Sequence, residues 1–187
     1  GETLYGGNAL VNVLGNADRV TWGGEDAFRS GVVIAVTGSA DAAFTILVDG
    51  RPSGTVEVGQ RMPLLLPEYR VYEVRLQPIG APPILFDTSS REVSLYPGTI
   101  KTLQWQVDTV FVVFGRLLDA AGEPLAYAPL EGGIERAYTD ANGYFQLEVA
   151  GSAELRVADP RVAPCSVTVE GPTANEELTD LGEVSCR

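Results

Sequence analysis

The stretch that decides the fold is residues 112–149, VVFGRLLDAAGEPLAYAPLEGGIERAYTDANGYFQLEV, because it carries the strongest local structure signals in the chain. Residues 113, 115 and 117 alternate with residues 114, 116 and 118, as the two faces of a strand do. Turn-forming residues interrupt this pattern between Asp119 and Gly122, and a second extended run begins at Pro124. This order is typical of a strand, a turn and a second strand.

A second turn is expected at Asn142 and Gly143. Both residue types tolerate a positive φ, and an Asn-Gly pair between alternating runs is the best short-range signal for a hairpin. After this pair, polar and apolar side chains alternate over residues 144–149. The stretch therefore predicts a small antiparallel sheet with one buried face.

The same stretch resembles the prealbumin-like modules related to the regulatory domains of carboxypeptidases. In those modules a Gly-x-Leu-x-Asp-x-x-Gly-x-Pro-Leu segment, here residues 115–125, leads to Thr-Asp-x-x-Gly-x-Phe, here residues 139–145. Such modules accompany many functions, so this resemblance implies a fold and names no activity.

The composition is that of an all-β protein with room for two small cores. Of the 187 residues 45% are hydrophobic, 21 glycines and 12 prolines interrupt the apolar runs, and no long window shows a helical period. The formal net charge of -12 argues against a nucleic-acid partner, whose phosphates need a basic surface. Residues 109–187 are the more acidic part, with 5 basic and 13 acidic side chains.

The spacing of the runs predicts two small β-sandwich domains. Short strands separated by turn residues follow one another from residue 31 onward, which is typical of an immunoglobulin-like sandwich over residues 29–108. The prealbumin-like module is expected over residues 109–187. Residues 1–28 predict either an N-terminal hairpin or the remnant of a transmembrane β-barrel. They contain no signal peptide, so we expect a mature form or a part of a larger exported protein.

The two cysteines, Cys165 and Cys186, are the only candidates for a covalent cross-link, and the chain has no histidine. Two thiolates leave the tetrahedral shell of zinc half empty, and without histidine a Ser-His-Asp or Cys-His catalytic centre is excluded. A disulfide is favoured over two buried free thiols, and it would imply an oxidising compartment. We expect no metal, no cofactor and no enzymatic activity.

Four residues near turns of the second half are candidates for a partner-binding surface, because exposed aromatic side chains anchor protein interfaces. They are Tyr127, Leu130, Tyr138 and Tyr144. In the first half, Tyr69 and Tyr72 flank a corner at Pro67, where packing in the corner is favoured over contact with a partner. Glu176 and Glu177 lie in a polar segment that predicts an exposed loop, with a site for a cation or a basic partner as the alternative.

Several motifs, taken in order, resemble the C-terminal part of outer-membrane ushers, the secretion pores of the chaperone-usher pilus pathway. They are Pro-x-Tyr-Arg-x-Tyr-x-Val-x-Leu at 67–76, Phe-Asp at 86–87 with Val93, Tyr-Pro-Gly at 96–98, Trp105, Val-Phe-Gly-Arg to Pro-Leu at 113–125, Cys-x-Val-x-Val at 165–169 and Ser-Cys-Arg at 185–187. The pattern is most similar to the alternate, or alpha-fimbrial, branch of CS1-type pili. It extends over roughly residues 31–187.

The resemblance implies soluble domains on the periplasmic face of the outer membrane that bind chaperone–subunit complexes during pilus assembly. Their other partners would be the barrel and plug of the full-length usher, and no nucleotide would be needed, because strand exchange drives assembly. Cys165 and Cys186 would correspond to the cysteine pair of the last usher domain. The alternative is a pair of structural or adhesive modules from a secreted bacterial surface protein.

Overall fold

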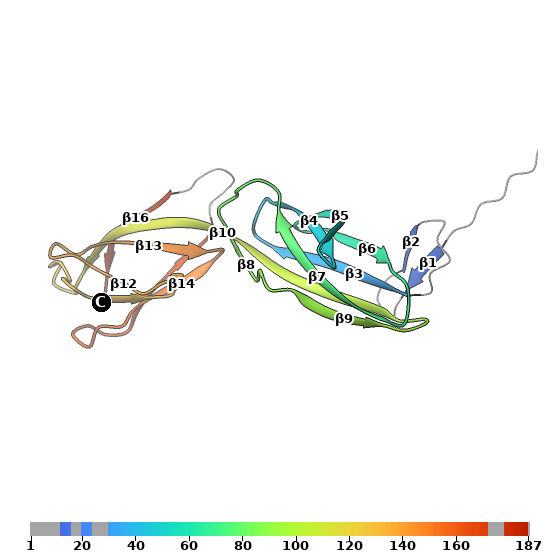
Figure 1. Cartoon of the computed structure of the whole chain (residues 1–187). Helices are drawn as coiled ribbons and strands as arrows, with labels where there is room; N and C mark the ends of the chain where they lie inside the picture. Colours follow the sequence, from blue (N-terminus) through green and yellow to red (C-terminus); the bar gives the residue numbers. More distant parts are fainter. Residues whose placement is uncertain (1–11, 16–19, 24–29, 172–177, 187) are drawn as a thin grey trace, which may run out of the picture. The chain divides into compact units, whose positions relative to one another are not determined.

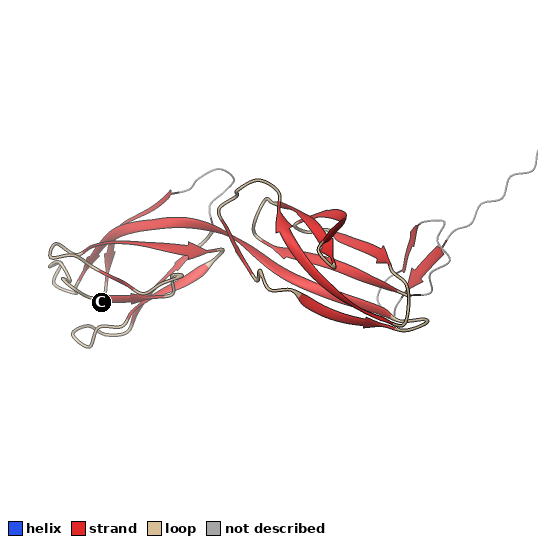
Figure 2. Cartoon of the chain, viewed as in Figure 1, coloured by secondary structure: helices blue, strands red, loops and turns tan. Residues whose placement is uncertain are grey.

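The computed structural model of the chain describes residues 12–15, 20–23, 30–171 and 178–186. Every regular element in these ranges is a β-strand, as Figure 2 shows, which confirms the all-β class. The described residues form two compact units. The first comprises those within Gly1–Thr37, Ala42–Ile79 and Thr88–Trp105, and the second those within Gly38–Asp41, Gly80–Asp87 and Gln106–Arg187.

Two short strands begin the described part of the chain. Strand β1, Asn12–Gly15, pairs antiparallel with β2, Val20–Gly23, and places Val13 opposite Trp22. The other residues of the segment 1–28, predicted as a hairpin or a barrel remnant, lie outside the described ranges.

The first unit is a sandwich of two sheets with an apolar interior. One sheet has the order β5-β4-β7-β9, and the other contains β6 and β3 with the first part of β10 beside β3. The bounds of these strands are β3 Gly31–Gly38, β4 Ala43–Val48, β5 Arg51–Glu57, β6 Arg61–Leu65, β7 Arg70–Pro78, β9 Arg91–Leu95 and β10 Ile100–Leu118.

A tight turn at Asp49 and Gly50 joins the strands β4 and β5. Asp49 has a φ of 49° and Gly50 a φ of 75°, so both central residues occupy the left-handed region that a two-residue hairpin turn requires. Trp105 is fully buried in the first unit. The guanidinium carbon of Arg91 lies 4.2 Å from the centre of the Trp105 ring, which adds a cation–π contact to its packing.

The second unit also has two sheets. In one, the later part of β10 pairs antiparallel with β13 and parallel with β16, while the short strand β8 pairs with Val107, Asp108 and Thr109. The other has the order β12-β11-β14-β15. The bounds are β8 Ile84–Phe86, β11 Pro129–Glu131, β12 Ala137–Tyr138, β13 Tyr144–Ala150, β14 Ala153–Val157, β15 Cys165–Val169 and β16 Leu178–Ser185.

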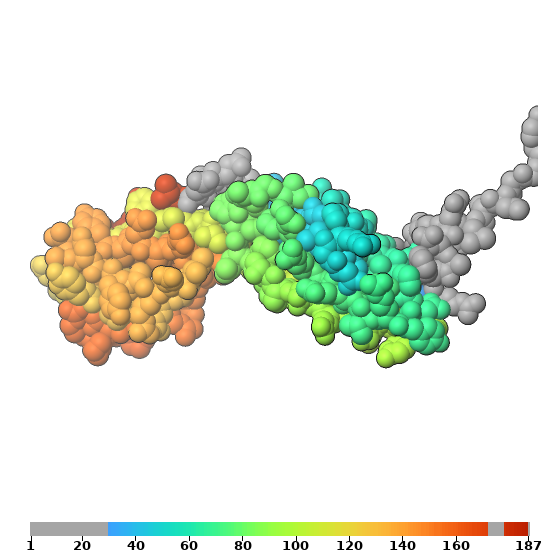
Figure 3. All heavy atoms as spheres, viewed as in Figure 1, coloured from blue at the N-terminus to red at the C-terminus, as the bar shows by residue number. Residues whose placement is uncertain are grey.

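The interior of the second unit is built from alternate residues of these strands, as the period of two predicts. Residues 145, 147 and 149 of β13 and residues 111, 113 and 117 of β10 point inward, together with Leu130, Leu155 and Val169 of the other sheet. Full burial of a large aliphatic or aromatic side chain contributes about 1.5–3 kcal/mol relative to exposure. Figure 3 shows one face of the second unit, whose residues from 106 onward are coloured yellow to red.

The Asn142-Gly143 turn forms, but it does not join a hairpin. The Asp140 Oδ1 atom accepts hydrogen bonds from the backbone N–H groups of Asn142, at 2.8 Å, and Tyr144, at 2.9 Å. Gly143 has a φ of 81°, and a Cβ atom there would lie 2.5 Å from the carbonyl oxygen of Leu117. The flanking strands β12 and β13 belong to different sheets, so the hairpin prediction was wrong.

Candidate partner-binding surface

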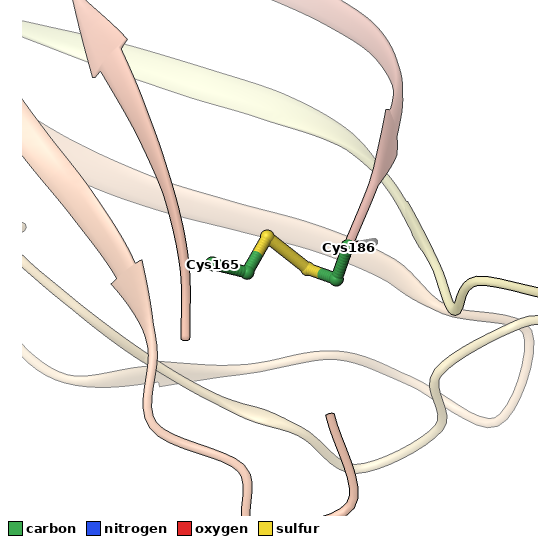
Figure 4. The surroundings of a disulfide bond; sticks show 2 residues. All are labelled: Cys165 and Cys186. Atoms are coloured by element: carbon green, nitrogen blue, oxygen red, sulfur yellow. A yellow bond between two sulfur atoms is a disulfide. The ribbon is translucent and has the colours of Figure 1, made fainter. Parts of the chain in front are cut away.

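The disulfide joins the two sheets of the second unit. Cys165 begins β15 and Cys186 follows β16, and Figure 4 shows the bond between their sulfur atoms. Their Cα atoms are 5.3 Å apart. Cys186 is part of the buried core, and its backbone N–H donates a hydrogen bond of 2.9 Å to the carbonyl oxygen of Leu118. The predicted disulfide is therefore present, and it holds the end of β16 against the opposite sheet.

Of the four predicted partner-binding residues, Leu130 does not lie on the surface. Its side chain is 2% exposed and belongs to the core of the second unit, because β11 directs it inward between the sheets. Its assignment to a partner-binding surface was wrong. Tyr127, Tyr138 and Tyr144 are 69%, 59% and 54% exposed, so all three rings are accessible to a partner.

Tyr127 lies on the loop between β10 and β11, in a backbone conformation that a bulky residue rarely adopts. Its φ is 57°, and in the first unit Tyr69 has a φ of 60° with 75% of its surface exposed. The left-handed region costs a residue with a Cβ atom about 1–2 kcal/mol, which glycine avoids. Burial of these rings does not offset that cost. An unfavourable backbone conformation that displays a ring on the surface is a feature of binding sites.

Tyr138 borders an open groove of about 530 Å³ beside β13. The groove exists because the chain arches away from the strand. The backbone N–H of Ile134 donates to the carbonyl oxygen of Glu148, and that of Asp140 donates to the carbonyl oxygen of Tyr144, each at 2.8 Å. Six residues thus span the distance that four residues of β13 cover. The groove is lined by Glu135, Arg136, Ala137, Tyr138, Gln146, Leu147 and Glu148.

The guanidinium group of Arg136 is the basic group of this groove. It forms an ion pair with Glu131 of β11. A hydrogen bond with Tyr138, followed by the charge of Glu131, raises the pKa of Arg136. Because Arg136 is already paired, Glu135 and Glu148 leave the groove with an acidic character.

Tyr144 begins β13 and is held in place by a neighbouring arginine. The guanidinium carbon of Arg116 lies 5.4 Å from the centre of the Tyr144 ring. The Arg116 Nε–H donates a hydrogen bond of 3.1 Å to the carbonyl oxygen of Asn142, and Arg116 Nη1 lies 3.2 Å from Glu183 Oε1. Arg116 therefore links the strands β10, β13 and β16 on the solvent side of the sheet.

The remaining predicted sites give no chemical centre. Glu176 and Glu177 lie outside the described residues. Within the described ranges, no group of three or more metal-ligating side chains could hold a metal ion. In the same ranges, no helix has the length and apolar character needed to cross a membrane.

Comparison with known families identifies the class of domain to which the second half belongs. Residues 95–187 match a family described as CS1-pili formation C-terminal. The chain thus carries, in these residues, a domain of the CS1-pili formation C-terminal family.

A related protein agrees with this assignment. The chain is 30% identical over 154 residues to the probable outer membrane usher protein EcpC of Escherichia coli O157:H7, in an alignment that covers 76% of this chain. The family match and this relative confirm the resemblance to the C-terminal part of an usher. The chain spans only 18% of the length of EcpC.

Solved structures show weaker likeness. The Bacillus anthracis TIE protein aligns with 83% of this chain and 34% of its own, at 15% identity and a TM-score of 0.37. The minor pilin GBS52 of Streptococcus agalactiae aligns with 84% of this chain and 96% of its own, at 10% identity and a TM-score of 0.35. Both TM-scores are too low to define a shared fold.

Proposed function

We propose that the chain is the C-terminal region of an outer-membrane usher, where it binds chaperone–subunit complexes on the periplasmic side during the assembly of a CS1-type pilus. The observation that carries this proposal is the match of residues 95–187 to a family of CS1-pilus formation. The relationship to a probable usher supports the same role and the same location.

The structure supports a binding role for the second unit. Its two sheets enclose one apolar core and are joined by the Cys165–Cys186 bond, so its surface residues have a rigid support. Three tyrosines are displayed on that surface, and tyrosine is among the residues that contribute most to protein interfaces. A disulfide also fits an oxidising compartment such as the periplasm.

The proposal is tested by measuring binding of the purified, oxidised chain to a purified chaperone–subunit complex of a CS1-type pilus. We expect saturable binding of the complex in biolayer interferometry, and weaker binding of the chaperone alone. The double variant Tyr138→Ala/Tyr144→Ala should bind the complex more weakly if these rings take part. A wild-type chain that binds neither the complex nor its separate components would overturn the proposed function.

A further inference from the structure

The solvent-facing side of the sheet formed by β16, β10 and β13 carries apolar side chains where polar ones are expected. In β10, Phe111 and Val113 point into the core, so the alternation turns Val112 and Phe114 outward. Leu178 of β16 lies opposite Val112, and Tyr144 of β13 lies opposite Arg116 of β10. The three strands are drawn in Figure 1.

These outward side chains form what we call the outer apolar face, which consists of Val112, Phe114, Tyr144 and Leu178. Phe114 is 37% exposed, Tyr144 54% and Leu178 60%, while Val112 is half-buried. The core of the unit lies on the other side of the sheet, so the folding of the unit does not require apolar residues here. Apolar side chains gathered on an exposed sheet face are typical of an interaction surface.

Acidic side chains surround the outer apolar face. Glu148 lies opposite Val112 on β13, Asp180 lies opposite Phe114 on β16, and Glu183 lies opposite Arg116. Arg116 is the basic group on this face, and its ion pair with Glu183 neutralises one carboxylate. The face therefore keeps a net negative charge from Glu148 and Asp180, in agreement with the excess of acidic residues in the second half of the chain.

The arrangement has the anatomy of a protein interface. Such interfaces have a centre rich in aromatic residues and arginine, and a rim of polar or charged side chains that sets orientation and association rate. Phe114, Tyr144 and Arg116 provide the centre, and Glu148 and Asp180 provide the rim. A partner that fits this face presents an apolar centre surrounded by lysine or arginine side chains.

We propose that the outer apolar face is the surface on which this chain docks its protein partner, a basic-rimmed face of the chaperone–subunit complex. This inference rests on the proposed function, and it adds the surface and the charge of the partner. The groove beside Tyr138 adjoins this face, because its lining includes Glu148 of the rim and Gln146, which lies opposite Phe114.

The apolar centre is tested with the variant Phe114→Gln/Leu178→Gln. We expect its affinity for the complex to fall by about tenfold or more, as for residues at the centre of an interface. The matched control is Leu85→Gln, which replaces an apolar side chain of the same unit that is 47% exposed on β8; Leu85 lies opposite Asp108 of β10, four residues along that strand from Val112 and outside the outer apolar face. The control should bind within about twofold of the wild type, and all variants should keep the wild-type near-ultraviolet circular dichroism.

The acidic rim is tested with Glu148→Lys/Asp180→Lys, and Glu123→Lys, on the exposed turn after β10, is the control. We expect the rim variant to associate about tenfold more slowly at low ionic strength, and the difference to shrink as salt is added. The control should keep at least half of the wild-type association rate.

The outcomes separate the surface from the function. If the wild type binds the complex and both face variants bind like their controls, the outer apolar face is not the docking surface, while the proposed function stands. If the wild type does not bind, the proposed function fails, and this inference fails with it. If sedimentation shows that the wild type self-associates and the Phe114→Gln/Leu178→Gln variant does not, the face joins two copies of this chain, and the assignment to the complex is overturned.

Discussion

The hydroxyl group of Tyr72 donates a hydrogen bond of 2.8 Å to the carbonyl oxygen of Pro67, and so ties the strand β7 to the corner that precedes it. The ring is 3% exposed, and this burial is the main reason why the pKa of Tyr72 is raised. The sequence predicts a corner of this kind from two tyrosines beside a proline. Tyr72 fills the corner. Tyr69 is exposed to solvent, and its ring makes a T-shaped contact with the ring of Tyr96.

Replacing Tyr72 by phenylalanine removes this hydrogen bond and keeps the ring. We expect the free energy of unfolding to fall by about 1 kcal/mol, the usual net contribution of such a bond. Urea denaturation followed by fluorescence measures the change. Tyr96→Phe is the control, because Tyr96 is 58% exposed. This variant should lower the free energy of unfolding by less than about 0.5 kcal/mol. Equal effects of both substitutions would contradict a specific role for the Tyr72 hydroxyl.

Reduction of the disulfide should destabilise the second unit. Cys165 and Cys186 are 21 residues apart, and closing a loop of this size lowers the entropy of the unfolded chain by an amount worth roughly 3 kcal/mol. Denaturation with and without dithiothreitol measures the difference. The variant Cys165→Ala/Cys186→Ala should have the stability of the reduced wild type and should not respond to the reductant. A reduced protein as stable as the oxidised one would contradict the prediction.

Protonation of the Asp159 carboxylate in acid should lower the free energy of unfolding. The carboxylate accepts hydrogen bonds from Arg161 Nε at 2.9 and 3.0 Å and from the Arg161 backbone N–H at 2.9 Å. The side-chain hydrogen bonds from Arg161, followed by the backbone one, lower the pKa of Asp159 below its usual value. Because the unfolded state then binds the proton more readily, this stabilisation is complete above about pH 4 and is lost as the pH falls through the lowered pKa.

Asp159→Asn should therefore be less stable than the wild type at neutral pH, and the gap should narrow as the pH falls from about 5 to 2. Arg161→Gln removes the guanidinium group that binds the Asp159 carboxylate, and the difference in stability between this variant and the wild type should narrow in the same way as the pH falls. Urea midpoints across this range give the comparison. A gap that stays constant with pH would show that the pKa of Asp159 does not differ between the folded and unfolded states.

The left-handed conformation of Tyr127 predicts a substitution that raises stability. Asparagine tolerates a positive φ better than tyrosine does, so Tyr127→Asn should raise the free energy of unfolding by a few tenths of a kcal/mol up to about 1 kcal/mol. Tyr138→Asn is the control, because Tyr138 is similarly exposed but lies in the strand β12 with an ordinary backbone, and this change should be neutral or unfavourable. Thermal denaturation of both variants decides. A loss of stability in Tyr127→Asn would show that its ring packs against the unit.

Local patterns in the sequence predict much of this fold. The alternation over residues 144–149 predicts the buried face of β13, and Asp49 with Gly50 predicts the turn that joins β4 to β5. These features depend on the side-chain period and on the φ preferences of a few residues, which neighbours in the chain determine. The antiparallel pairing of β13 with β10 agrees with the small sheet predicted for residues 112–149, but β10 as the partner of β13 was not predicted, because strand pairing depends on contacts between segments apart in the sequence.

The candidate surface was predicted less well for the same reason. Ala128 and Leu130 are apolar residues two positions apart, a spacing that places both on one face of a strand and so was a signal that Leu130 points inward. Both are buried in the structure. Val112 and Phe114 occupy the positions of β10 that alternate with the core residues, where polar side chains are usual. Their apolar character was a signal for an exposed apolar face. That Leu178 joins them could not be foreseen, since the parallel pairing of β16 with β10 brings together residues 66 positions apart.

The covalent link between β15 and β16 has a practical consequence for producing this protein. The strand β16 covers one edge of β10, and an uncovered strand edge is a template for intermolecular pairing. Protein synthesised in a reducing cytoplasm lacks the disulfide that keeps β16 in place, so it should aggregate during purification. Export to an oxidising compartment, or refolding with a glutathione redox couple, is the preparation route that the architecture favours.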